Sequence, residues 1–83
     1  MNIFVGNVNY RLSNEALEQL FSTYGQVTSA RIIIDKMTGR SKGFGFVEMP
    51  NDDEAKAAIA GLHETEVMGR KMIASEAKPS QRG

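Results

Sequence analysis

Hydrophobic and polar residues follow two different periodicities along this chain. In some stretches apolar and polar residues alternate and β-branched or aromatic residues are frequent, which predicts strands. In others the apolar residues recur at spacings of three and four, which predicts amphipathic helices. The predicted strands are 3–8, 27–34, 42–49 and 71–76, and the predicted helices are 13–24 and 51–62. This order of elements indicates a single α+β domain.

Both predicted helices begin at residues that are suited to capping. Ser13 is a favoured N-cap for the first helix, and Gly25 suits a left-handed stop after it. Asn51 is a favoured N-cap for the second helix, and Glu54 three residues later completes the pattern of a capping box. The apolar stripes of the two helices predict these core residues: Leu17, Leu20, Phe21, Tyr24, Ala55, Ala58, Ile59 and Leu62.

The strand predicted over 42–49, KGFGFVEM, raises the main functional question. Side chains of a strand alternate between its two faces. One face of this strand would carry Lys42, Phe44, Phe46 and Glu48. Such a face cannot be core, because burying unpaired charges is costly. Aromatic rings beside charges suit a ligand that covers them, and a nucleic-acid base stacks on a ring while a cation meets its phosphate. The alternative is an ordinary strand whose phenylalanines lie under a helix.

Two residues of other strands join this predicted surface by parity. Phe4 points outward in the first strand, where Ile3 and Val5 point inward. Arg31 points outward in the second strand and adds a cation to the same face. Tyr10 follows the first strand, and its role stays undecided between packing and stacking.

Further cations flank the strand 42–49 and the C-terminus. Arg40 lies in the polar connection that precedes the strand, and together with Lys42 it suits point contacts to phosphate. Lys78 opens a basic segment without apolar residues and is a further candidate for phosphate. We expect 79–83 to form a flexible tail.

The octamer 42–49 resembles the longer ribonucleoprotein motif of the RNA recognition motif family, K/R-G-F/Y-G/A-F-V-x-F/Y. Met49 departs from the pattern, because the family prefers an aromatic residue there. Its parity is inward, so the departure concerns packing and leaves the outward face unchanged. The hexamer 3–8, IFVGNV, is similar to the family's shorter motif. The resemblance covers roughly residues 3–78.

The resemblance implies a ferredoxin-like split βαβ fold, written βαββαβ, with a four-stranded antiparallel sheet and two helices on one face. It also implies that the first and third strands lie side by side, which would bring Phe4, Phe44 and Phe46 together. On this basis we expect an RNA recognition motif domain over 1–78 that binds single-stranded RNA and needs no cofactor. Whether single-stranded DNA also binds is left open.

Charge and composition limit the alternatives. Ten Lys and Arg balance ten Asp and Glu, so any attraction to phosphate must come from how the charges are distributed. Cations predominate between residues 31 and 42, whereas the predicted helices are acidic. A protein-binding module is the competing function, because a net charge near zero suits it as well.

The sequence carries little that would support catalysis or membrane insertion. His63 is the single histidine and there is no cysteine, so we expect no metal site and no enzyme. The chain shows no basic leader, long apolar run or small-residue cleavage site, and we expect a cytoplasmic monomer that does not enter a membrane.

Overall fold

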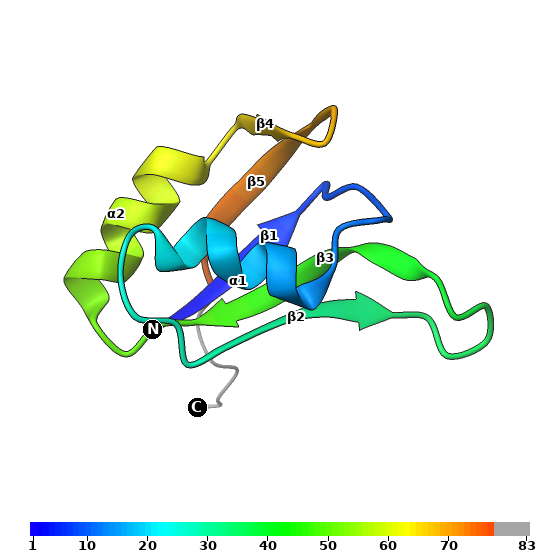
Figure 1. The fold of residues 1–83 in the computed structure, drawn as a ribbon, viewed down its shortest axis with the longest axis horizontal. Helices are drawn as coiled ribbons and strands as arrows, with labels where there is room; N and C mark the ends of the chain where they lie inside the picture. Colours follow the sequence, from blue (N-terminus) through cyan, green and yellow to red (C-terminus); the bar gives the residue numbers. More distant parts are fainter. Residues whose placement is uncertain (78–83) are drawn as a thin grey trace.

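The computed structural model describes residues 1–77, which form one layer of strands and one layer of helices (Figure 1). The elements are β1 (Asn2–Gly6), α1 (Asn14–Ser22), β2 (Ser29–Ile34), β3 (Ser41–Glu48), α2 (Asp52–Leu62), β4 (Thr65–Val67) and β5 (Arg70–Glu76). The predicted α+β element order is confirmed. Lys78 and the predicted tail 79–83 lie outside the described residues. No helix in the described part of the chain is long and apolar enough to span a membrane.

The sheet has the strand order β2-β3-β1-β5-β4, with antiparallel neighbours throughout. β4 is a three-residue strand that pairs with the start of β5 and extends the predicted four-stranded sheet. β1 and β2 are parallel with β3 between them, and β3 and β5 are parallel with β1 between them. Right-handed connections of this kind place α1 and α2 on one face of the sheet, α1 against β2 and α2 against β5 (Figure 1).

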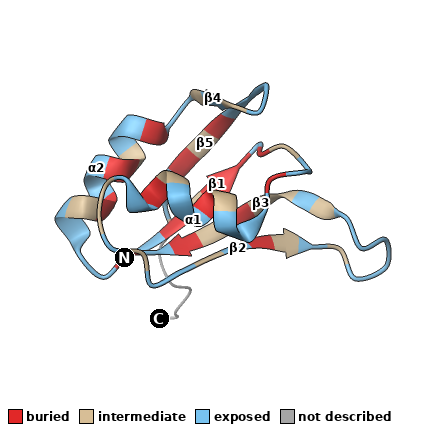
Figure 2. Ribbon diagram, in the orientation of Figure 1, coloured by how far each residue is buried: buried red, intermediate tan, exposed pale blue. Residues whose placement is uncertain are grey.

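The hydrophobic core lies between the sheet and the helices (Figure 2). Its buried residues include Ile3, Val5, Val47, Met72 and Ala74 of the strands and Met49 directly after β3, and its buried helix residues are Leu17, Phe21, Ala55, Ala58 and Leu62. Met49 is fully buried, as its inward parity predicts. Leu20, Tyr24 and Ile59, which were also predicted to be core residues, are partly buried and pack against the core at its margin. Each helix turns only a narrow stripe toward the sheet, and these residues lie beside that stripe.

The helix ends confirm two predicted N-caps and correct two other predictions. The backbone N–H of Ala16 donates to Ser13 Oγ at 3.1 Å, and that of Glu54 donates to Asn51 Oδ1 at 3.0 Å. The Glu54 carboxylate does not complete a capping box, because it accepts from the backbone N–H of Gln26 at 3.1 Å. Gly25 is not in the left-handed region. Its role is to leave room for the Glu54 side chain, which any Cβ at position 25 would strike.

Candidate nucleic-acid interface

Three phenylalanine rings form a cluster on the face of the sheet that the helices leave open. Phe4 comes from β1, and Phe44 and Phe46 come from β3. The ring centroids are 5.9 Å apart for Phe4 and Phe44, 5.8 Å for Phe4 and Phe46, and 6.2 Å for Phe44 and Phe46. All three side chains are half-buried, because they pack on one another and no described element lies over them. The predicted outward orientation of the rings is confirmed.

The register of the sheet aligns this cluster with a cation. Phe46 is opposite Phe4 on one side and opposite Arg31 on the other, and Phe4 is in turn opposite Ser75 of β5. Paired residues of neighbouring antiparallel strands point to the same face, so the four side chains form one row across the sheet. A base stacked on Phe46 would therefore have the exposed Arg31 guanidinium at its side.

Two glycines of β3 shape the strand that presents the rings. Gly43 has φ +86°, a left-handed conformation that other residues rarely adopt. Gly45 faces the core, and a Cβ there would strike the carbonyl oxygen of Arg31 in β2. The glycines of the octamer thus serve backbone geometry and strand packing, while the side chains between them supply the surface.

The other predicted cations occupy different places. Lys42 is exposed on β3 just before Gly43, where the left-handed backbone and a register shift between β2 and β3 interrupt the regular alternation of the strand. Arg40 lies in the connection between β2 and β3, where its carbonyl oxygen accepts from the backbone N–H of Asp35 at 2.8 Å. Arg40 is therefore beyond the end of the ring cluster and not on the sheet itself. Lys78 is outside the described residues, so its predicted contact remains a prediction.

One further cation, Lys71, belongs to the open face and is absent from the predicted site residues. Lys71 of β5 has the same parity as Ile73 and Ser75, which the alternation of that strand places outward. The pairing of β5 with β1 brings Ile73 opposite Gly6 and therefore beside the rings. The signal was present in the alternation of β5, but only the strand order shows that β5 is adjacent to β1.

Tyr10, whose role the sequence left undecided, is an exposed residue next to the open face. Its side chain is 64% exposed, and the Arg70 guanidinium lies 5.8 Å from the centre of its ring. Arg70 Nη2 also donates to Asn7 Oδ1 at 2.8 Å, which fixes the guanidinium between the two. A Cβ on Gly43 would be 3.4 Å from the Tyr10 ring, so Tyr10 adjoins the start of β3.

The charges of this surface are available to a ligand. Among residues 1–77 the Met1 amino group pairs with Asp52, and the His63 ring lies 3.8 Å from the Glu64 carboxylate; both contacts lie away from the rings. Acidic residues gather in the first turn of α2, whereas Arg31 and Lys42 lie on strands of the open face. The predicted separation of charge between helices and sheet is therefore only partial, because the strands also carry the exposed carboxylates of Glu48, Glu66 and Glu76.

Known proteins with this architecture provide a comparison. The sequence matches the RNA recognition motif family over residues 3–73. It is 44% identical over 81 residues to the protein RbpB of Nostoc sp., an alignment that covers 98% of this chain and 79% of that protein. The crystal structure of the RNA-binding protein PG1 superposes with a TM-score of 0.92 and 52% identity, covering 99% of both chains. The Sex-lethal protein in its RNA complex gives a TM-score of 0.90 with 28% identity, over 96% of this chain and 48% of that chain. Since the family match spans nearly all of the described fold, this chain belongs to the RNA recognition motif family.

Proposed function

We propose that this protein binds single-stranded RNA on the open face of its sheet. The observation that carries the proposal is the cluster of three phenylalanine rings on a face that neither helix covers. The residues that we assign to binding are Phe4, Phe44 and Phe46 for stacking and Arg31, Arg40, Lys42 and Lys78 for phosphate.

Single strands fit this surface better than duplexes do. An aromatic ring can stack only on a base whose flat face is free, and in a duplex the faces are occupied by neighbouring bases. The rings lie on the inner strands β1 and β3, and Arg31 lies beside them on β2, so bases would lie over the rings and phosphates toward the cations. The solved complex of the related Sex-lethal protein with RNA supports this choice of ligand.

The competing function is a protein-binding module. The net charge of zero supports it, because a protein that relied on phosphate attraction alone would be expected to be basic. Half-buried rings on an open face, beside cations that form no ion pair within residues 1–77, favour RNA instead. Proteins of this family generally act by binding, and we expect no catalytic activity. A monomeric state and a cytoplasmic location remain predictions of the sequence.

A titration with labelled oligonucleotides tests the proposal. Fluorescence anisotropy would compare a short single-stranded RNA, the DNA of the same sequence and the RNA duplex at low ionic strength. We expect the single-stranded RNA to bind at least about ten-fold more tightly than the duplex, because pairing removes the stacking faces. Equal affinity for the duplex would indicate recognition of helix shape and would contradict the proposal. Absence of binding to every nucleic acid would favour the protein-binding alternative.

A further inference from the structure

A polar hollow adjoins the ring cluster at the end of the face remote from the β2–β3 connection. Its volume is about 290 Å³, and it is lined by Asn2, Ser29, Arg31, Phe46, Val47, Glu48 and Ala77. This volume is close to the lower limit of pockets that hold small organic ligands, roughly 300 Å³. Phe46 is thus shared between the ring cluster and the hollow.

The register of the sheet places the polar groups of the hollow in one row. Glu48 is opposite Asn2 of β1 and opposite Ser29 of β2. This row is the next one along the strands from the row that contains Phe46 and Arg31. Residues two apart on a strand are separated by roughly 6.8 Å, so a base stacked on Phe46 can extend its edge over Asn2 and Glu48.

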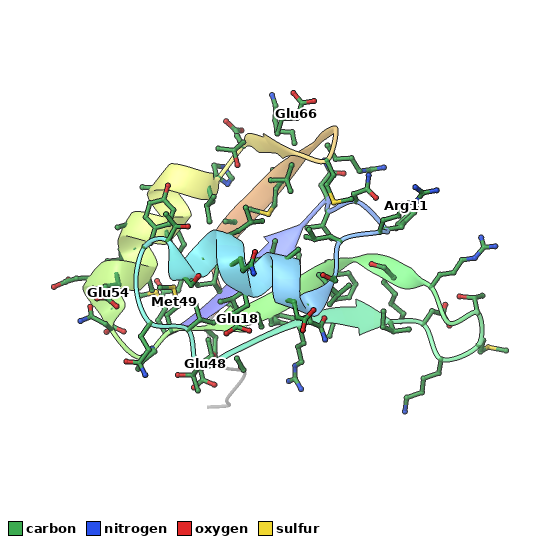
Figure 3. The ribbon with its side chains drawn as sticks, viewed as in Figure 1. Arg11, Glu18, Glu48, Met49, Glu54 and Glu66 are labelled. Carbon is green, nitrogen blue, oxygen red and sulfur yellow. The ribbon has the colours of Figure 1, made fainter. Side chains whose placement is uncertain are left out.

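The negative charge of the Glu48 carboxylate would repel phosphate, so attraction of phosphate does not explain its presence on this surface. It is exposed at the end of β3, while the adjacent Met49 is buried between the sheet and α2 (Figure 3). In the described part of the chain, Glu48 takes part in no ion pair. A negative charge here would weaken binding of the RNA backbone unless it accepts hydrogen bonds from the base. An ionised carboxylate is purely an acceptor, so it selects bases by their donors.

We propose that this hollow is a guanine site, with Glu48 as the residue that determines the preference. Guanine alone presents two adjacent donors on its Watson–Crick edge, N1–H and the N2 amino group, which match the two oxygens of a carboxylate. Next to them guanine carries the acceptor O6, which suits the amide donor of Asn2. Uracil presents a single N–H between two carbonyl oxygens, and both of these would be repelled by the carboxylate.

The inference deepens the proposed function, because it takes for granted that bases stack on Phe46. It adds a base preference that ring stacking cannot supply, since every base has a flat face. The two other polar residues of the hollow, Arg31 and Ser29, are compatible with a bound guanine. Arg31 lies beside the stacked base, and Ser29 brings a hydroxyl that can donate or accept.

The test measures the affinity of oligouridine that carries one central guanosine, inosine, adenosine or uridine. Inosine lacks only the N2 amino group of guanosine, so it isolates one of the two donors. The variant Glu48→Gln replaces one acceptor oxygen with a donor and leaves the size of the side chain unchanged. The matched control is Glu66→Gln, which removes an exposed carboxylate of β4 that does not line the hollow. Thermal unfolding of both variants confirms that the fold is retained.

We expect the wild-type protein to prefer the guanosine oligonucleotide to oligouridine by roughly 5- to 100-fold, the range of one bidentate contact. Inosine should lose part of this preference. Glu48→Gln should reduce the preference to about two-fold or less and leave oligouridine bound at least as tightly, because the repulsive charge is gone. Glu66→Gln should keep the full preference.

Three results would overturn the guanine site. The first is equal affinity of the wild-type protein for all four oligonucleotides, and the second is an unchanged preference in Glu48→Gln. The third is an equal effect of Glu48→Gln and Glu66→Gln, which would mean that Glu48 acts only through its negative charge and not through a contact with the base. Each of these results leaves RNA binding itself intact. Failure of the wild-type protein to bind any of the oligonucleotides would instead remove both proposals.

Discussion

The two faces of β3 place very different demands on neighbouring residues of one strand. Gly45 and Val47 face the helices and are buried, whereas Phe44 and Phe46 face away from the helices and stay half-exposed. Residue size does not explain the difference, because the larger side chains are the ones left outside. The cause is that both helices pack on one face of the sheet. The stability of the domain depends on that face, and the opposite face is free for a ligand.

The largest effect should come from a phenylalanine on the covered face. Phe21 of α1 is fully buried, and Phe21→Ala would leave a cavity that the core cannot easily close. We expect the free energy of unfolding to fall by about 3–5 kcal/mol, a large share of the total for so small a domain. Chemical denaturation monitored by circular dichroism measures the free energy of unfolding of the variant and of the wild-type protein. A loss below about 1.5 kcal/mol would mean that the two faces do not differ in the way described.

The same substitution on the open face should mainly affect RNA affinity. We expect Phe44→Ala or Phe46→Ala to weaken binding by about 1–3 kcal/mol per stacked base, which is roughly 5- to 100-fold. The rings also contact one another, so the free energy of unfolding should fall by about 1 kcal/mol. Anisotropy titration and denaturation of the same preparations separate the two quantities. Phe46→Tyr serves as the control, since it keeps an aromatic face for stacking.

Two results for Phe46→Ala would contradict this difference between the phenylalanines of the two faces. If Phe46→Ala unfolds as readily as Phe21→Ala, the ring is needed for the core and the assignment of the open face is wrong. If Phe46→Ala stays folded and retains full RNA affinity, the rings serve another partner, and the protein-binding alternative gains support.

The smallest effect should come from single cations of the open face. We expect the affinity of the wild-type protein for single-stranded RNA to fall with salt with a log–log slope of about two to three, because few cations reach phosphates. Arg31→Ala or Lys42→Ala should each reduce the slope by roughly 0.7, the value for one phosphate contact on a single strand. Lys56→Ala, which removes an exposed cation of α2 on the opposite layer, is the control. A wild-type slope near zero, or an equal reduction in Lys56→Ala, would contradict the proposed role of these cations.

Local sequence patterns predicted the caps and strand faces better than the packing around them. Ser13 and Asn51 cap their helices as expected, because an N-cap depends on a side chain and a backbone group only a few residues apart. The predictions for Gly25 and Glu54 were wrong, because both residues take part in one contact between segments that are far apart in the chain. The Glu54 carboxylate reaches the backbone beside Gly25. No local pattern could have indicated that Glu54 would reach the backbone of Gln26.

The sequence by itself determined which side chains share a face along the regular parts of the strands, because a period of two is a property of any extended backbone. It did not indicate the register shift between β2 and β3, after which Ile34 is exposed. It also contained the motifs by which the RNA recognition motif family is identified. Only the tertiary structure decided which strands are neighbours and in what register. Phe4 and Phe46 are far apart in the chain, and their contact depends on the pairing of β1 with β3. The same pairing sets Asn2 opposite Glu48, because hydrogen bonding between strands fixes every row of side chains at once.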